Sequence, residues 1–342
     1  MLKFLAKIFR FIYQFNKDRI TELPELVLSR ILSMLTMRDV VKIGSQSRRW
    51  ASIRLLRIDV DFDVPNMFHS INDMPELSYF PFVFGNNKKR GKPPFDNEVL
   101  NIFARIRHEL VRRVDQFLLS FRGEKIRLLR VCFFFDHRST SSLNNWIHRA
   151  ISLEVEEMNI LLSNKPYFSA TVPEDKRYCF PHKLFSGHST LKQLHLELAV
   201  LKAPSEFSGF NRLETLYLVD VIVGEEFLGC LSLKCLVLKV LKFEVCGFSS
   251  ALKIDSQSLR HLGIINCHGM LKVEIYAKNL RAFEYCGFHE VVFDIYSVYF
   301  PHLENMYLYF RDGIPDRLSL YASMPKLQTL IMHMAMSSNI VS

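Results

Sequence analysis

An apolar pattern that recurs along most of the chain places the tightest constraint on its fold. Each copy has an apolar residue, two variable residues, a second apolar residue, one variable residue and a third apolar residue. The copies begin at Ile126, Val155, Leu191, Leu213, Leu233, Leu259, Leu280, Leu303 and Leu327. From the third copy onward, the steps between starts are 22, 20, 26, 21, 23 and 24 residues. A nearly constant period of this size indicates stacked copies of one small structural unit.

This period is typical of leucine-rich repeats, in which each copy gives one short strand and a return segment. One copy cannot bury its apolar side alone, so stacking must supply a continuous core. The chain has 342 residues, of which 29 are Phe, and we expect Leu and Phe to fill the space between copies. The predicted fold class is an α+β or α/β solenoid. Its repeats span residues 123–342 and form a parallel β-sheet on the concave face.

The variable positions of the repeats are predicted to form the functional surface. Side chains alternate across a strand, so the residues beside the middle apolar position should point outward. The predicted outward residues are Gln193, His195, Glu197, Thr215, Tyr217, Cys235, Val237, Lys239, His261, Gly263, Ala282, Glu284, Asn305, Tyr307 and Tyr309. The candidates for binding a protein are His195, Tyr217, Lys239, His261, Glu284, Tyr307 and Tyr309. Tyrosine offers a large contact area with one polar tip. The alternative is that each is an ordinary exposed strand residue.

A second apolar pattern lies in front of the repeats, within residues 18–50. Its first helix has apolar residues at helical spacing: Leu28, Ile31, Leu32 and Leu35. Pro24 suits the first turn, where its missing N–H is no loss. Thr36 and Asp39 have capping-box spacing for a second helix, and a third is predicted near Ser47. Three short helices in about 40 residues lie at the lower limit of independent stability. We therefore expect them to contact a partner surface.

The same segment resembles the F-box of plant F-box/leucine-rich-repeat proteins of the FBD-associated type. The matching residues are Asp18-Arg19-Ile20, Leu23-Pro24, Leu28, Ile31-Leu32, Leu35, Asp39-Val40-Val41 and Ser47-Arg48-Arg49-Trp50. The repeats resemble those of the same family, so the likeness covers nearly the whole chain from Asp18. Two residues depart from the family pattern. Gly44 lies inside the predicted second helix, where Gly costs about 1 kcal/mol relative to Ala, and Gln46 occupies a position that is usually apolar.

The resemblance implies a non-catalytic, substrate-recognition subunit of an SCF-type ubiquitin ligase. In that family the F-box binds a Skp-type adaptor, which links it to a cullin–RING scaffold, while the repeats bind the target protein. By position, the adaptor-binding residues are Leu23, Pro24, Ile31, Leu32, Leu35, Val40 and Trp50. Two alternatives stay open. One is a repeat scaffold whose degenerate F-box only stabilises the array, and the other is a protein tethered to a membrane surface by its N-terminal segment.

The predicted domains are an amphipathic segment at 1–17, the F-box at 18–62, a linker with a capping helix at 63–122, and the repeats. The N-terminal segment has the spacing of a basic amphipathic helix, and we favour a leader helix over a membrane-surface helix. In the linker, Lys88-Lys89-Arg90 lies in a loop rich in Gly, Asn and Pro. Helical spacing runs from Val99 to Leu119.

The sequence contains no P-loop, Rossmann fingerprint, HExxH or nucleophile elbow. Cys179, His182 and His188 have a faintly zinc-like spacing, but a structural site needs a fourth ligand, so we interpret them as packing residues. The seven cysteines include no CxxC, which favours reduced thiols and a nuclear or cytoplasmic protein. The net charge of +9 is scattered, which disfavours nucleic acid as a partner. We expect no cofactor, no metal and no enzymatic activity.

Overall fold

A computed structural model of the protein describes residues 23–33, 35, 37, 39–40, 59–68, 96–121, 123–162, 172–185, 189–248, 251–288, 292–294, 300–311 and 324–335. The chain divides into two compact units, Met1–Arg130 and Val131–Ser342. Among the described residues, no helix is long and apolar enough to cross a membrane. Trp50, His188 and the segments 1–17 and 88–90, for which the sequence makes predictions, lie outside the described residues.

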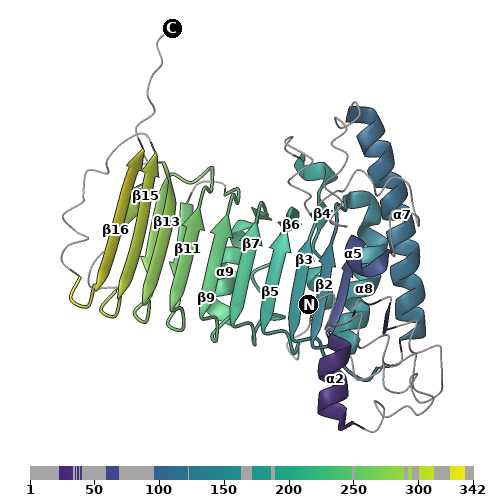
Figure 1. Ribbon diagram of the computed structural model, residues 1–342. Coiled ribbons are helices and arrows are strands. Elements are labelled where there is room, and N and C mark those ends of the chain that lie inside the picture. Colours follow the sequence, from purple (N-terminus) through teal and green to yellow (C-terminus); the bar gives the residue numbers. More distant parts are fainter. Residues whose placement is uncertain are drawn as a thin grey trace. The chain divides into compact units, whose positions relative to one another are not determined.

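The second unit contains a parallel sheet with one strand per repeat (Figure 1). In spatial order its described strands are β3 (Glu157–Leu161), β5 (Gln193–Glu197), β7 (Thr215–Val219), β9 (Val240–Glu244), β11 (His261–Ile265), β13 (Ala282–Phe288), β15 (Asn305–Arg311) and β16 (Thr329–Ala335). The spatial order is the order along the chain, as stacking of successive repeats requires. The predicted leucine-rich-repeat array is thus confirmed.

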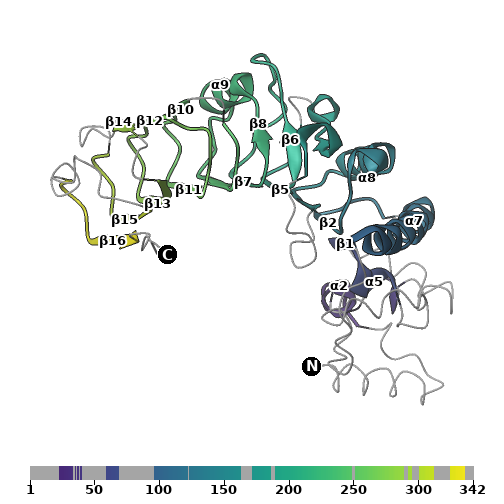
Figure 2. The same ribbon diagram turned by 90° about the horizontal axis from the view of Figure 1, so that it is seen from above.

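The return segments form a second layer behind this sheet (Figure 2). Two of them are the helices α8 (Thr140–Ser152) and α9 (Glu225–Lys234). The others form two small parallel sheets, one of β4 (Tyr178–Cys179), β6 (Ala199–Leu201) and β8 (Ile222–Val223), and one of β10 (Ala251–Asp255), β12 (Lys272–Tyr276) and β14 (Val292–Asp294). Short 3-10 turns lie at His137–Ser139, Glu174–Lys176 and His182–Leu184. The repeats therefore share the sheet and differ in their returns.

The core of the second unit lies between the two layers. The apolar strand residues face it, as the fully buried Leu216 and Leu218 of β7 illustrate. Phenylalanines from the returns fill the remaining space. The Phe210 ring packs against Phe207 and Phe227, with centroid separations of 4.9 and 6.1 Å. Buried aromatic side chains of this kind supply much of the apolar area that stabilises a core. The abundance of Phe is therefore explained by the spacing of the layers.

Backbone hydrogen bonds continue beyond both ends of the strands and fix the distance between repeats. Before the strands, one carbonyl accepts two N–H groups of the next repeat. Lys192 O, for example, accepts from Glu214 N at 2.7 Å and Thr215 N at 3.0 Å. After the strands, a residue with positive φ occupies the same place in four repeats: Leu198, Asp220, Val245 and Asn266. Their N–H groups also donate to the next repeat. Equivalent residues of neighbouring repeats consequently stand side by side.

The predicted frame of one repeat, meaning the residue at which its pattern begins, is wrong. The pattern beginning at Leu233 falls on the end of α9 and the following turn, and the strand of that repeat is β9. The frame beginning at Leu238 places Leu241 and Phe243 in the core, where both are buried. Helix α9 carries apolar residues that imitate the repeat pattern, so the period alone could not separate the two frames. Cys235 and Val237 are therefore not strand residues.

The first unit contains α2 (Glu25–Ser33), β1 (Asp59–Asp63), α5 (Val64–Met67), α7 (Asp96–Ser120) and the opening residues of β2 (Leu128–Cys132). Helix α7 confirms the helical spacing predicted from Val99 to Leu119. Its Phe117 ring packs edge-on against Phe62 of β1, with centroids 5.7 Å apart. Its Arg113 donates to Met67 O at 2.7 Å and lies over the Phe68 ring. Helix α7 is thereby fastened to β1 and α5.

Two arginines connect the start of β2 to β1 within the first unit. Arg127 donates to the Asp59 carboxylate at 2.7 Å, and Arg130 donates to Asp61 at 2.7 Å and to Asp63 at 2.9 Å. Asp63 also caps α5, because its carboxylate accepts the Asn66 N–H at 2.8 Å. Charge-assisted bonds of this kind are stronger than neutral ones. They explain why the alternating Asp residues of β1 face the side on which the arginines lie.

Candidate protein-binding surface

The exposed face of the main sheet carries one continuous row of side chains across the whole second unit. This middle row consists of the central residue of each strand: Asn159, His195, Tyr217, Lys242, Gly263, Glu284, Tyr307 and Ile331. Each member is paired in register with the next, so the row is continuous. In the strands from β3 to β15, the residues on either side of the central one are buried in the core instead. The sheet thus aligns eight positions in one line, with side chains at all of them except Gly263.

Aromatic side chains occupy both halves of the middle row. The His195 and Tyr217 rings meet edge to face, with centroids 5.8 Å apart. Tyr217 and Tyr307 keep 36% and 40% of their surface exposed. Tyr309 stands next to this row on β15 and packs near His333, with centroids 6.3 Å apart. Half-exposed tyrosines on a rigid support are well suited to bind a protein, because they lose little conformational freedom on binding.

Lys242 and Glu284 form an ion pair that passes over the strand between them. The Lys242 Nζ lies 3.1 Å from Glu284 Oε2, although β11 separates their strands. Gly263 makes this possible, because a Cβ at that position would lie 3.0 Å from Lys242 Cγ. The lysine side chain occupies the space that a larger residue would fill. The centre of the row is therefore charged but internally matched.

Burial shifts the pKa of His195 at one end of the middle row. Loss of water around the ring lowers its pKa, and the nearby Glu244 carboxylate opposes this shift in part. Desolvation disfavours the charged imidazolium, and here it outweighs the attraction of the carboxylate. We therefore assign His195 as neutral near pH 7. It offers a ring face and one polar nitrogen rather than a positive charge.

The predicted binding residues divide into those that the middle row brings together and those that it does not. His195, Tyr217, Glu284 and Tyr307 belong to it, and Tyr309 is adjacent. His261 is exposed, but it lies one row away, beside Val240 and Ala282. The prediction of Lys239 as an outward strand residue is wrong, because it precedes β9. Lys242 was missed for the same reason, since its identification requires the frame at Leu238.

The predicted adaptor-binding residues also fall into two groups. Leu23 and Pro24 are exposed and Ile31 is half-buried, whereas Leu32, Leu35 and Val40 are buried among the described residues. Leu26 and Val27 are not among the predicted residues, although they are 83% and 42% exposed. Leu26 and Val27 lie in the first turn of α2, and the exposed Leu23 lies two residues before it. Helix α2 therefore has one apolar side facing the core and a second one facing solvent.

Side chains that could bind a metal ion do not cluster among the described residues. No group of three or more His, Cys, Asp or Glu residues among them could hold a metal ion. Cys179 is exposed and His182 is half-buried, while the third member of their motif is not described. All seven cysteines have free thiols. Burial raises the pKa of Cys235 to about 12, which makes its thiol a poor nucleophile.

Comparison with known proteins places the chain in a family. The sequence model of the At1g61320/AtMIF1 LRR domain matches residues 120–339. The F-box/FBD/LRR-repeat protein At4g03220 of Arabidopsis thaliana is 25% identical over 273 residues, which cover 77% of this chain and 45% of that protein. The Arabidopsis F-box protein At3g29830 is 25% identical over 299 residues, which cover 86% of this chain and 57% of that protein.

A shorter match is stronger in identity. The Arabidopsis F-box/LRR-repeat protein At3g26922 is 45% identical over 51 residues, which cover 15% of this chain and 17% of that protein. The chain spans about half the length of the two longer-matching relatives. No solved structure matches it. Because the family model covers more than half of the chain, the protein belongs to the At1g61320/AtMIF1 leucine-rich-repeat family, and it is a plant F-box/leucine-rich-repeat protein.

Proposed function

We propose that this chain is a non-catalytic subunit of an SCF-type ubiquitin ligase that recruits a target protein. Its N-terminal F-box segment would bind a Skp-type adaptor and, through it, a cullin–RING scaffold. Its repeats would bind the protein to be ubiquitinated, in the nucleus or cytoplasm. The names of the relatives, which combine F-box and LRR, support this assignment of roles. The ubiquitin-transfer chemistry would then belong to the other subunits.

The observation that carries the proposal is the solvent-facing apolar side of α2. Leu23, Leu26 and Val27 expose between 38% and 83% of their surface. Grouped apolar residues on a helix that already buries its opposite side indicate a contact with another protein. Leu23 and Pro24 are also the positions that the family resemblance assigns to adaptor binding. The sequence and the exposure of the side chains thus agree on this surface.

The middle row supports the second part of the proposal. It combines tyrosines, a neutral histidine and a matched ion pair on a rigid sheet. Interfaces are enriched in tyrosine, and groups that need no rearrangement bind at a lower entropic cost. We therefore assign target binding to the middle row and to Tyr309 beside it. Recognition by this surface requires no cofactor.

The adaptor contact can be tested by a pull-down of the full chain with a purified Skp-type adaptor. Leu23→Ala/Pro24→Ala and Leu26→Ala/Val27→Ala should each weaken binding by about tenfold or more, as loss of interface anchors does. Leu119→Ala is the matched control, because Leu119 is 75% exposed on α7 and belongs to no proposed contact. Circular dichroism should show that all variants remain folded.

The outcomes separate the proposal from its alternative. Loss of binding in both double variants with retention in the control supports the adaptor contact. Equal binding by all variants would place the contact elsewhere on the chain. If even the unmodified chain fails to bind the adaptor, an interaction scaffold built on the repeats becomes the better account. The family model supports only the repeats in that case, because its match begins at residue 120.

A further inference from the structure

A second row of side chains runs beside the middle row, three residues earlier in every repeat. This edge row consists of the residues whose backbone groups join successive repeats before the strands: Glu156, Lys192, Glu214, Lys239, Arg260, Arg281, Glu304 and Gln328. The Arg260 N–H donates to Lys239 O at 2.8 Å, and the Arg281 N–H donates to Arg260 O at 2.8 Å. Neighbouring members therefore stand about 4.8 Å apart, the spacing of strands in a sheet.

As far as the described residues show, the charges of the edge row are paired except at its centre. Lys192 pairs with Glu156 at 2.8 Å, and Lys239 pairs with Glu214 at 2.6 Å. Arg281 lies 3.5 Å from the Glu304 carboxylate. Arg260 is left between Lys239 and Arg281, which are both cations and both already paired. Within the described part of the chain, no carboxylate pairs with Arg260.

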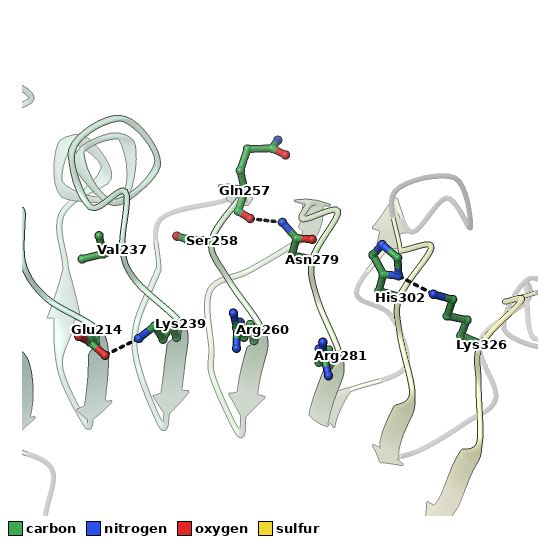
Figure 3. A pocket seen from close by; sticks show the side chains of 10 residues that line it. All are labelled: Glu214, Val237, Lys239, Gln257, Ser258, Arg260, Asn279, Arg281, His302 and Lys326. Atoms are coloured by element: carbon green, nitrogen blue, oxygen red, sulfur yellow. Dashed lines mark hydrogen bonds and ion pairs between the residues drawn. The ribbon is translucent and has the colours of Figure 1, made fainter.

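A hollow of about 540 Å³ lies over this part of the edge row (Figure 3). Its lining residues are Glu214, Val237, Lys239, Gln257, Ser258, Arg260, Asn279, Arg281, His302 and Lys326. Arg260 and Arg281 stand on neighbouring repeats among these lining residues (Figure 3). The only carboxylate among its described lining residues, Glu214, is the one that pairs with Lys239. The lining therefore has three more cations than carboxylates.

Two hydrogen bonds hold polar side chains that line the hollow. The Lys326 Nζ lies 2.9 Å from His302 Nδ1. An ammonium group can only donate, so Nδ1 accepts this bond. The Asn279 amide donates to Gln257 O at 2.6 Å, which orients its carboxamide. The described lining thus combines a net positive charge with neutral polar side chains.

We propose that this hollow binds an extended acidic segment of a protein partner. Adjacent like charges repel, so Arg260 stands at an electrostatic cost between Lys239 and Arg281. Carboxylates or phosphates placed over Arg260 would reduce this repulsion and add an attraction. A guanidinium group offers a planar pair of N–H donors that fits either anion. The lining runs from the β7 repeat to the β16 repeat, a distance of about 24 Å at the usual strand spacing. An extended segment of about seven residues spans that distance.

The lining favours a peptide over a nucleic acid. Among the residues that line the hollow there is no Phe, Tyr or Trp, and single-stranded nucleic acids depend on such side chains for base stacking. The inference rests on the proposed function only in that the repeats hold a protein. It does not require the adaptor contact, because α2 contributes nothing to the hollow. Peptide binding and adaptor binding can therefore fail separately.

Fluorescence anisotropy with the full chain tests the proposal. Three labelled Gly-Ser peptides of about nine residues would carry phosphoserine, Asp or Gln at alternate positions. The phosphoserine and Asp peptides should bind and the Gln peptide should not, and binding should weaken as salt is raised from 50 to about 200 mM. Arg260→Gln/Arg281→Gln should weaken binding by about tenfold or more. Arg260→Lys should lose part of the affinity, because it keeps the charge without the paired donors.

Lys183→Gln is the matched control for loss of one positive charge, since Lys183 is exposed and does not line the hollow. It should leave the affinity within about twofold. Equal weakening by this control, or equal binding of the Gln peptide, would overturn the proposal. So would a single-stranded oligonucleotide that binds more tightly than either acidic peptide and depends equally on Arg260. The adaptor pull-down on the Arg260→Gln/Arg281→Gln variant should be unchanged, which keeps the two proposals independent.

Discussion

The middle row and the edge row follow the same strands, yet they handle charge in opposite ways. In the middle row, Lys242 reaches past Gly263 to Glu284, so the charge is matched two repeats away. In the edge row, Arg260 stands between two cations that already have carboxylate partners. The backbone imposes one spacing on both rows. Whether a charge is matched therefore depends only on the residue that each neighbouring repeat supplies.

This difference suggests that the two rows offer different kinds of interaction to a binding partner. A matched row with half-buried aromatic rings offers shape and apolar area, which are available without rearrangement. A row with an unmatched cation offers attraction over a distance and sensitivity to salt. A target protein that lies along the strands would meet both rows. The predictions below test whether the rows share one support and whether their charges have opposite effects on stability.

The largest effect is expected from the core that supports both rows. Leu262 is fully buried between Arg260 of the edge row and Gly263 of the middle row. Leu262→Ala should lower the free energy of unfolding by about 2–5 kcal/mol, because it removes buried surface and leaves a cavity. The exposed neighbour His261 provides the control. His261→Ala should change the free energy of unfolding by less than about 0.5 kcal/mol. Urea unfolding monitored by circular dichroism measures both. Similar losses in the two variants would contradict a common core support.

Removing a charge from each row should change the free energy of unfolding by smaller amounts and in opposite directions. Lys242→Gln removes one partner of an ion pair whose side chains are about one-third exposed, and should destabilise the protein by about 0.2–1 kcal/mol. Arg260→Gln removes a like charge between two cations and should stabilise it by about a few tenths of a kcal/mol. Urea midpoints at low and high salt measure both changes, which should shrink together as salt screens the charges. A loss of stability in both variants would mean that Arg260 is held by favourable contacts.

Much of this surface follows from the repeat pattern, and the rest depends on three-dimensional context. The pattern placed His195, Tyr217 and Tyr307 on the exposed face, because alternation along a strand is a local property. It failed at Lys242, because α9 supplies apolar residues that fit the repeat period nearly as well. The frame at Leu238 gives steps of 25 and 21 residues, and the frame at Leu233 gives 20 and 26, so each stays within two residues of the other steps, which run from 21 to 24.

The edge row was beyond sequence reasoning for a different reason. Its members precede the strands, where no alternation rule applies, and only the carbonyl bonds between repeats place them side by side. That no carboxylate among the described residues pairs with Arg260 is likewise a property of its neighbours in space. The same holds for α2, where the sequence indicated one apolar stripe. Which of its apolar side chains face solvent was decided by packing within the first unit, as the 83% exposure of Leu26 illustrates.

The smallest effect concerns the pH dependence of the middle row. Burial lowers the pKa of His195 in the folded protein, so the unfolded chain takes up this proton more readily. The contribution of His195 to stability should therefore be complete above about pH 6.5 and should decline as the pH falls below that value. His195→Phe should remove this part of the slope, and the difference between the two proteins in urea unfolding from pH 7.5 to 5 isolates it from other histidines.

Added salt sharpens this last comparison, because the two rows should respond to it differently. The lowering of the His195 pKa arises mainly from loss of water around the ring, and the Glu244 carboxylate opposes this lowering. Salt weakens interactions between charges but does little to the cost of burying one. The difference in pH slope between the unmodified chain and His195→Phe should therefore persist at high salt, where the effect of Arg260→Gln has faded. If this difference in pH slope disappears at high salt, charge pairing rather than burial determines the stability effects in both rows.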